Sequence, residues 1–446
     1  MDVKKITDSL DDRLFSDKFF KKCYKVYAFW LVFAPIIETF FHIIGLKFII
    51  MFQLMLISTL FGLTKFFEII FNIKKFSLKN KTIIDLLVVC LLFWFFVSTI
   101  VNQEVNISLV FGICYFCCFY LFLNIEEKDF KLLAYLFVCE MIFDTILGFI
   151  DLKNEIIPGF SENECTMSFQ FLNPNWSSFV LLVAQILSLW FVCSLQKIWQ
   201  KILLFIGYLV MAAGMFIGGS YAPEMSLFLC ETFLLIYFWV KNKKCPFWIL
   251  SALISTIFIS FAVWFVPAFR SVTTANANFF YETLAVIDNK LGTKLVEGVS
   301  TIFDKMFGWG VIYEVPGSNG WSRSYFIAKS FEAIFASAKS FIFGCGPGFI
   351  YSDIRVHNCF LVVWLEFGIV GILLFLSAIV MLLIRFFKVK KSECLVVLIS
   401  IFSILLFDSF FCCIEPYCFP VFVIFSTYFY KKLYSTELKN KQNVLQ

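Results

Sequence analysis

Residues 357–385 read HNCFLVVWLEFGIVGILLFLSAIVMLLIR, and this stretch decides the class of fold. Between Cys359 and Ile384 it carries one charged residue, Glu366. An α-helix that crosses a bilayer needs about 20 mostly apolar residues, because lipid offers no hydrogen bonds to an open backbone. This stretch is long enough to tilt, or to break at Gly368 or Gly371. It therefore predicts a membrane-spanning helix.

The whole chain has the same character. Of its 446 residues, 61% are hydrophobic, 15% are charged and 63 are Phe, and the mean hydropathy is +0.87. Soluble domains are about a quarter charged. One aqueous core cannot hide so much apolar surface, so the bilayer is the natural solvent. We expect an all-α, polytopic membrane helix bundle.

Apolar runs of similar length predict about twelve spans. They are expected near residues 26–45, 47–70, 82–101, 107–125, 130–150, 172–194, 201–218, 224–240, 246–268, 357–385, 394–410 and 415–430. The predicted organisation is a cytoplasmic N-terminal segment (1–25), a bundle of nine spans (26–268), a large extracytoplasmic loop (269–356), three more spans (357–430) and a cytoplasmic tail (431–446).

Basic residues set the orientation. Lys and Arg concentrate in short segments between the apolar runs, such as KNKK at 241–244 and RFFKVKK at 385–391. Cytoplasmic loops carry such an excess, so both termini are predicted to be cytoplasmic, in the cell (inner) membrane. The N-terminal segment has no cleavable signal peptide pattern. The net charge of +5 follows these topology signals, so nucleic-acid binding is not expected.

The loop 269–356 is long for a connector, and such loops are usually functional or disordered. From Ser324 to Phe343, large apolar residues recur at steps of three and four. This pattern predicts one amphipathic helix that lies on the membrane or packs back on the bundle. The run Gly344-Cys-Gly346-Pro-Gly348 that follows predicts a tight turn into the next span. It does not fit a nucleotide-binding loop.

His357 is one of two His in the chain and lies where the outer loop enters the span, next to Asn358. A His at a wet membrane edge can accept a proton as a general base, and it can equally anchor the start of a helix. His42 has no comparable surroundings.

Three arginines are expected on the outer face: Arg270, Arg323 and Arg355. A guanidinium binds phosphate in a planar fork and keeps its charge when partly desolvated. Contact with lipid headgroups is the alternative for each of them.

Acidic residues inside predicted spans are costly, and they mark candidate functional positions. They are Glu38, Asp85, Glu140, Asp144, Glu231, Glu366 and Asp408. Glu366 follows His357 by nine residues, about 13 Å along a straight helix. It is therefore expected to play a supporting or structural part. The scattered Cys residues show no zinc-ligand spacing, and no metal or cofactor is expected.

Together these segments resemble the O-antigen ligase and O-antigen polymerase superfamily. The resemblance is carried by Arg323-Ser-Tyr-Phe-Ile-Ala-Lys-Ser-Phe-Glu-Ala-Ile, then Phe343-Gly-Cys-Gly-Pro-Gly-Phe, then His357-Asn-Cys-Phe-Leu-Val-Val-Trp-Leu-Glu366-Phe-Gly-Ile-Val-Gly. Leu172-Asn-Pro-Asn175-Trp is similar to the family's Asn-Pro-Asn motif, and a late, large outer loop is also typical. These motifs cover about 60 residues.

The resemblance implies a GT-C-like membrane bundle and a metal-independent, inverting glycosyltransferase. The donor would be a polyprenyl-pyrophosphate-linked oligosaccharide, and the acceptor a glycan hydroxyl. His357 would act as general base and Arg323 would bind the pyrophosphate, assisted by Arg355, Arg270, Asn175 and Asn358. Gly346 and Glu366 would support the site. Many members have a Ser-Arg pair where this chain reads Gly219-Ser220-Tyr221-Ala222. One expected pyrophosphate contact is therefore missing.

The implied activities differ in their acceptor. A polymerase of O-antigen or capsule repeat units is favoured over a ligase to lipid A core, because no acceptor-specific region is evident. A transporter of lipid-linked glycan is the non-enzymatic alternative, and it predicts acids and broken helices at the membrane midplane. A chain-length regulator or a flippase is the expected protein partner, besides membrane lipid.

Overall fold

The computed structural model describes residues 83–103, 127–151, 161–163, 166–167, 174–218, 221–242, 246–265, 323–347, 349 and 359–389. These residues belong to two compact units. Unit 1 comprises Met1–Glu140 and Lys329–Gln446, and unit 2 comprises Met141–Ala328. Each unit is considered by itself below.

Helices occupy the positions of seven predicted spans. They are α4 (Ile83–Asn102), α6 (Glu127–Asp151), α7 (Pro174–Ser194), α8 (Ile198–Gly218), α9 (Tyr221–Asn242), α10 (Phe247–Phe265) and α15 (Cys359–Val389). Within the described residues, five helices are long and apolar enough to cross a membrane: Phe130–Ile150, Ser177–Ser194, Ile198–Gly218, Pro223–Val240 and Phe360–Met381. Runs predicted near 26–45, 47–70, 107–125, 394–410 and 415–430 lie outside the described residues.

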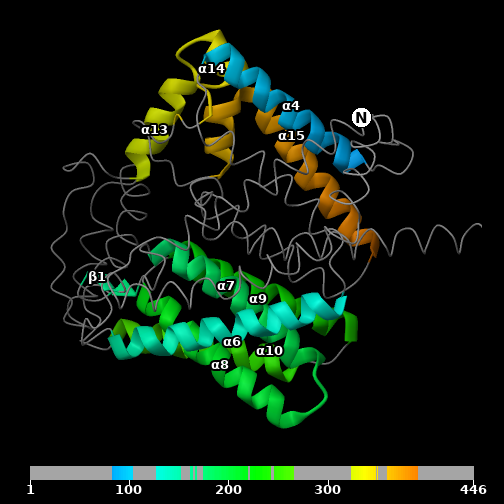
Figure 1. The fold of residues 1–446 in the computed structure, drawn as a ribbon, viewed down its shortest axis with the longest axis vertical. Coiled ribbons are helices and arrows are strands. Elements are labelled where there is room, and N and C mark those ends of the chain that lie inside the picture. The colour runs from blue at the N-terminus through cyan, green and yellow to red at the C-terminus, as the bar shows by residue number, and fades with distance from the viewer. Residues whose placement is uncertain are drawn as a thin grey trace, which may run out of the picture. The chain divides into compact units, whose positions relative to one another are not determined.

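Helices α7 to α10 form the core of unit 2, and each of the four contacts the other three (Figure 1). Almost every side chain of α7 from Ser177 to Val192 is buried. Helix α6 joins this bundle where Ile142 packs over Gly207 of α8, where any side chain would overlap the Ile142 side chain. A fully buried helix with apolar residues all round is typical of the centre of a membrane bundle.

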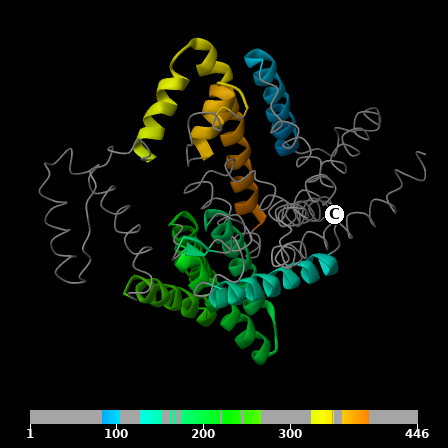
Figure 2. The same ribbon diagram turned by 60° about the vertical axis from the view of Figure 1, so that its left-hand side comes forward.

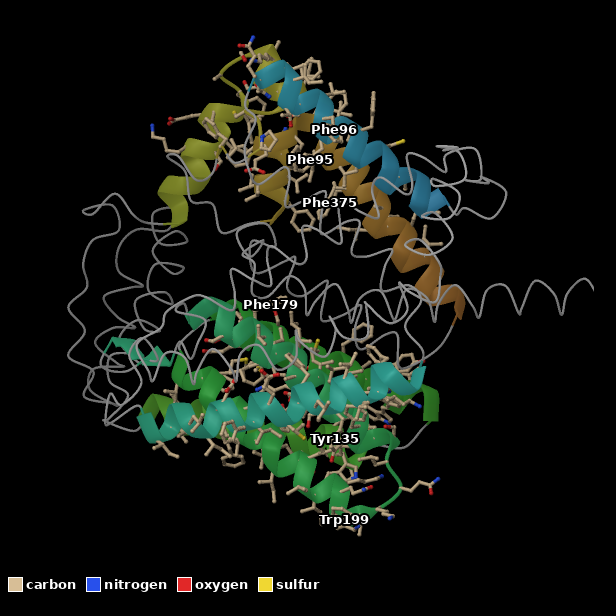
Figure 3. The ribbon with its side chains drawn as sticks, in the orientation of Figure 1. Phe95, Phe96, Tyr135, Phe179, Trp199 and Phe375 are labelled. Atoms are coloured by element: carbon tan, nitrogen blue, oxygen red, sulfur yellow. The ribbon has the colours of Figure 1, made fainter. Side chains whose placement is uncertain are left out.

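Unit 2 exposes large apolar side chains and buries several polar ones within an apolar core. Large apolar side chains on the outer faces are exposed, among them Trp199 at the start of α8 (Figure 3), Trp239 and Phe258. The interior meanwhile buries Gln185, Glu231 and other polar side chains. An exposed apolar surface of this kind is a liability in water but suits lipid. The described part of the chain is therefore an all-α, multi-pass membrane bundle.

A two-stranded hairpin interrupts the helices in unit 2. Strand β1 (Ser161–Asn163) pairs antiparallel with β2 (Thr166–Met167), and β2 contacts α7 and α8. The predicted all-helical fold did not include this hairpin. Two short strands in a polar connector give no periodic signal, since alternation is recognisable only over about four residues or more.

In unit 1, α4 packs along α15 (Figure 1). Val363, Phe367 and Ile372 of α15 form a buried cluster, and Trp94 and Phe95 of α4 pack against it. The rings of Phe95 and Phe367 lie 4.1 Å apart between centroids. Figure 3 shows Phe95 beside α15, whereas its neighbour Phe96 is 38% exposed.

The prediction of a single amphipathic helix from Ser324 to Phe343 is wrong in one respect, because the structure has two helices in this segment. These are α13 (Arg323–Ile334) and α14 (Ala338–Phe343), set at an angle to each other (Figure 2). Ser337 begins a new helix because its hydroxyl accepts from the Ser340 amide, and the Ser340 hydroxyl accepts from the Ser337 amide, both at 3.0 Å. This reciprocal capping box starts α14 in the middle of the apolar pattern.

Candidate functional site

The most unusual feature of unit 1 is a break inside α15 at Gly368. Gly368 has φ 68° and ψ −171°, which is non-helical backbone inside a membrane-spanning helix. A Cβ at this position would overlap the Ile342 carbonyl and the Gly344 amide. Only glycine fits both the dihedral angles and the close approach of the other backbone. Of the two predicted break positions, Gly368 is thus the one at which the helix breaks.

Such a break removes hydrogen-bond partners from the carbonyls that precede it, and lipid cannot replace them. The glycine-rich turn supplies two of the missing donors. The Cys345 amide donates to the Leu365 carbonyl at 2.7 Å, and the Gly346 amide donates to the Glu366 carbonyl at 3.2 Å. The turn therefore closes on the break in α15, rather than only connecting two helices.

Helix α4 supplies the other donors from one face. The indole of Trp94 donates to the Phe367 carbonyl at 2.8 Å. The Ser98 hydroxyl lies 2.8 Å from the Phe343 carbonyl and 3.0 Å from the Glu366 carbonyl, both of which accept. Three consecutive carbonyls at the break are thereby paired. We call this assembly of α4, the glycine-rich turn and the broken α15 the kink junction.

Asn102 completes the kink junction at the end of α4. Its amide donates to the Ser98 carbonyl at 3.0 Å and to the Gly344 carbonyl at 3.1 Å. Gly344 has φ 78°, and a Cβ there would overlap the backbone of Glu366. The turn thus lies directly against the broken helix, and Asn102 holds it in place.

Aromatic rings attach α13 and α14 to the first half of α15. Trp364 lies 6.2 Å from Phe331, 5.9 Å from Phe335 and 6.2 Å from Phe341 between ring centroids, in tilted or edge-on arrangements. Such geometries are favourable for aromatic pairs. The amphipathic segment was predicted either to lie on the membrane or to pack back on the bundle. These ring contacts with α15 favour packing on the bundle.

The predicted site residues are only partly brought together. Gly346 and Glu366 meet in the kink junction, where Glu366 is 5% exposed. Arg323 is the first residue of α13, and Asn175 is the second residue of α7. Both residues belong to unit 2, whereas the residues of the kink junction belong to unit 1.

The other four predicted residues, His357, Asn358, Arg355 and Arg270, lie outside the described residues. Helix α15 begins at Cys359, so His357 and Asn358 directly precede its first residue along the chain.

Sequence reasoning missed the α4 residues. Trp94, Ser98 and Asn102 are spaced by four, so they share one face of the helix. Polar side chains that recur at helical spacing near the end of an apolar run could have indicated a face of α4 that makes hydrogen bonds. The sequence does not show, however, which carbonyls these side chains donate to. The break that leaves those carbonyls without partners lies far away along the chain.

The described residues contain no group of three or more His, Cys, Asp or Glu that could hold a metal. The ion pair of α13, Lys329 with Glu332 at 2.6 Å, is largely exposed and contributes little to stability. The contacts described in the kink junction therefore position the backbone of α15 and of the glycine-rich turn.

Comparisons with protein-family models, with characterised proteins and with solved structures give no significant match.

Proposed function

We propose that this chain is a polymerase of a cell-surface polysaccharide. It transfers a glycan from a polyprenyl-pyrophosphate donor to a sugar hydroxyl on the outer face of the cell membrane, with both of its termini in the cytoplasm. This proposal rests on the motif resemblance of residues 323–371 and 172–176. The described geometry adds physical support, because the kink junction fixes helix α15, which begins two residues after His357.

The order and spacing of these motifs is the observation that carries the proposal, and the kink junction adds to it. The first half of α15 begins two residues after His357 and is fixed at its far end by the kink junction. A catalytic group on a rigid element is held more accurately than one on a free loop, and small displacements reduce rates strongly.

In the proposed reaction, the acceptor hydroxyl oxygen attacks the anomeric carbon of the donor sugar. The bond from that carbon to the pyrophosphate oxygen breaks, and configuration inverts. His357 takes the hydroxyl proton, and Arg323 stabilises the polyprenyl pyrophosphate that leaves. Arg355, Arg270, Asn175 and Asn358 are proposed to bind donor or acceptor.

Transport of a lipid-linked glycan is the second candidate, and two observations favour it. The structure contains a broken helix at Gly368 and a buried carboxyl group, Glu231, halfway along α9. Both features occur at transporter binding sites. They belong to different units, however, and the break is filled by hydrogen bonds of the protein itself.

The test substitutes His357→Ala and Arg323→Ala in the producing cell, with His42→Ala and Arg323→Lys as matched controls. Glycan length is followed on gels together with the lipid-linked intermediates. We expect single repeat units to accumulate on the outer face with His357→Ala, whereas His42→Ala leaves the glycan unchanged. Arg323→Lys keeps the charge but loses the planar fork, so we expect intermediate lengths.

The other outcomes decide between the alternatives. Long chains that stay on the lipid carrier would favour a ligase. Repeat units that remain on the cytoplasmic face would favour a transporter. Unchanged glycan in both alanine variants would refute the catalytic assignment.

A further inference from the structure

Three oxygen-bearing side chains that the proposed glycan transfer does not use meet inside unit 2. They are Tyr208 of α8, Glu231 of α9 and Thr256 of α10, and all three are fully buried. The Tyr208 hydroxyl bonds Oε1 of Glu231, and the Thr256 hydroxyl lies 3.0 Å from the same oxygen. Tyr208 and Thr256 are themselves 2.8 Å apart. We call this closed triangle the mid-bundle ring.

The mid-bundle ring lies at the middle depth of the helices. Tyr208 is the central residue of the span Ile198–Gly218, and Thr256 is the central residue of α10, Phe247–Phe265. Glu231 is at the centre of the span Pro223–Val240. A carboxyl group at this depth is as far from water at either end as the helices allow, and such a group is a candidate functional site.

Counting protons indicates the state of the carboxyl group. The triangle has three oxygen–oxygen contacts, and a hydrogen bond needs one proton in each. Tyr208 and Thr256 carry one proton each, so an ionised Glu231 leaves one contact with none. If Oε1 of Glu231 is protonated, its own proton makes one of its two contacts. One hydroxyl proton is then available for the contact between Tyr208 and Thr256.

Within the described parts of α7 to α10, no basic residue is close along its helix to the level of Glu231. Helices α7 and α10 contain no charged residue. The basic residues of the described parts of α8 and α9 are Lys201 and Lys241, seven residues from Tyr208 and ten from Glu231, which is about 10 and 15 Å along a helix. Oε2 of Glu231 is buried and has no hydrogen-bond partner in the structure.

The other titratable groups nearby are acidic or neutral. On α9 itself they are Glu224, two turns before Glu231, and Cys230. Helix α6 packs on α8 through Ile142, and that residue lies between Glu140 and Asp144 in the sequence. The lysines of α6, Lys128 and Lys131, are close to its N-terminal end. These acids supply no positive charge that could offset an ionised Glu231.

We propose that Glu231 is a proton-binding site at the centre of the α7–α10 bundle, and that the proton it holds closes the mid-bundle ring. The proton joins α8, α9 and α10 through one set of three oxygens. Its release would leave a charge at mid-depth and remove one hydrogen bond from the ring, so the three helices would separate at this level. This inference does not depend on the proposed glycan transfer.

The experiment is infrared spectroscopy of the purified full-length protein in lipid nanodiscs, at pH 7 and in light and heavy water. A protonated carboxyl group gives a C=O stretching band that shifts on deuteration. We expect such a band in the wild type and its specific loss in Glu231→Gln, which keeps the shape of the neutral acid. Glu332→Gln, at an exposed carboxyl group of α13, is the matched control and keeps the band.

A second variant covers the case in which Glu231→Gln does not fold. Tyr208→Phe leaves the carboxyl group but removes one ring member, so we expect the band to shift in frequency and to persist. The proposal is refuted if the Glu231→Gln spectrum equals that of the wild type. It is refuted equally if Tyr208→Phe leaves the band in place without a shift.

Discussion

The kink junction and the mid-bundle ring meet the same requirement in different ways. Both keep polar groups paired inside apolar surroundings. The kink junction pairs backbone carbonyls, using amide donors of the glycine-rich turn and side chains of α4. The mid-bundle ring pairs three side chains from three unbroken helices. Backbone pairing fixes the path of the chain, so it tolerates few substitutions, whereas a side-chain ring tolerates changes that keep its shape.

The largest expected effect is at Gly368. The substitution Gly368→Ala adds a Cβ at a positive φ, in a place occupied by the backbone of Ile342 and Gly344. We expect it to destabilise the purified protein by at least about 3 kcal/mol, from strained dihedral angles and overpacking together. Thermal unfolding in detergent measures this.

The matched control is Ser377→Ala, on the exposed side of the same helix. It should leave the unfolding temperature nearly unchanged. Equal stability of Gly368→Ala and the wild type would show that the break in α15 is not needed.

Asn102→Ala is expected to have the second largest effect. It removes the donor to the Gly344 carbonyl while leaving the helix α4 intact. A buried carbonyl left unpaired costs about 1–3 kcal/mol. We also expect shorter glycans in the producing cell, because the turn that holds α15 loses its contact with α4.

Thr99→Ala is the control for Asn102→Ala, since the Thr99 hydroxyl bonds only the Phe95 carbonyl within its own helix. If both variants reduced stability equally, the contact between Asn102 and the turn would contribute nothing specific.

The smallest effect is expected in the mid-bundle ring. Thr256→Val keeps the shape of the side chain but removes its hydroxyl, while Tyr208 and Glu231 remain bonded. We expect a loss of about 1–2 kcal/mol, because the hydroxyl takes part in two of the three contacts of the ring and a net hydrogen bond contributes about 0.5–1.5 kcal/mol. Unfolding of the purified protein at pH 7 provides the measurement. A loss as large as that of Gly368→Ala would remove the contrast between the two regions.

Within the described residues, the amino-acid sequence predicts the positions of the long apolar helices well, because twenty apolar residues in a row leave few alternatives. It also anticipates a break in the span that carries Glu366, with Gly368 as one candidate. It does not anticipate Ser337, whose capping box divides the amphipathic segment, because three-residue and four-residue apolar steps continue across it. The kink junction depends on contacts between α4 and α15 about 270 residues apart. Local patterns carry no information on such pairing.

The candidate site likewise has one part that local sequence patterns predict and one part that depends on distant contacts. Sequence motifs select His357, Arg323 and their neighbours by residue type and order. The structure adds the residues that hold the broken helix α15, which are Trp94, Ser98 and Asn102. Their residue types do not indicate a function, so a sequence motif does not select them. The sequence predicts one member of the mid-bundle ring, because Glu231 is an acidic residue inside a predicted span. Its partners Tyr208 and Thr256 come from other helices.

The central claim is that a group held at the start of α15 catalyses glycan transfer. The most direct measurement uses the purified full-length chain and lipid-linked repeat units isolated from the producing cell, with glycan length followed over time. We predict that the wild type builds longer lipid-linked chains, that His357→Ala builds none, and that Asn102→Ala builds them more slowly. Wild-type protein that leaves single units unjoined, or His357→Ala that extends them at the wild-type rate, would contradict the account.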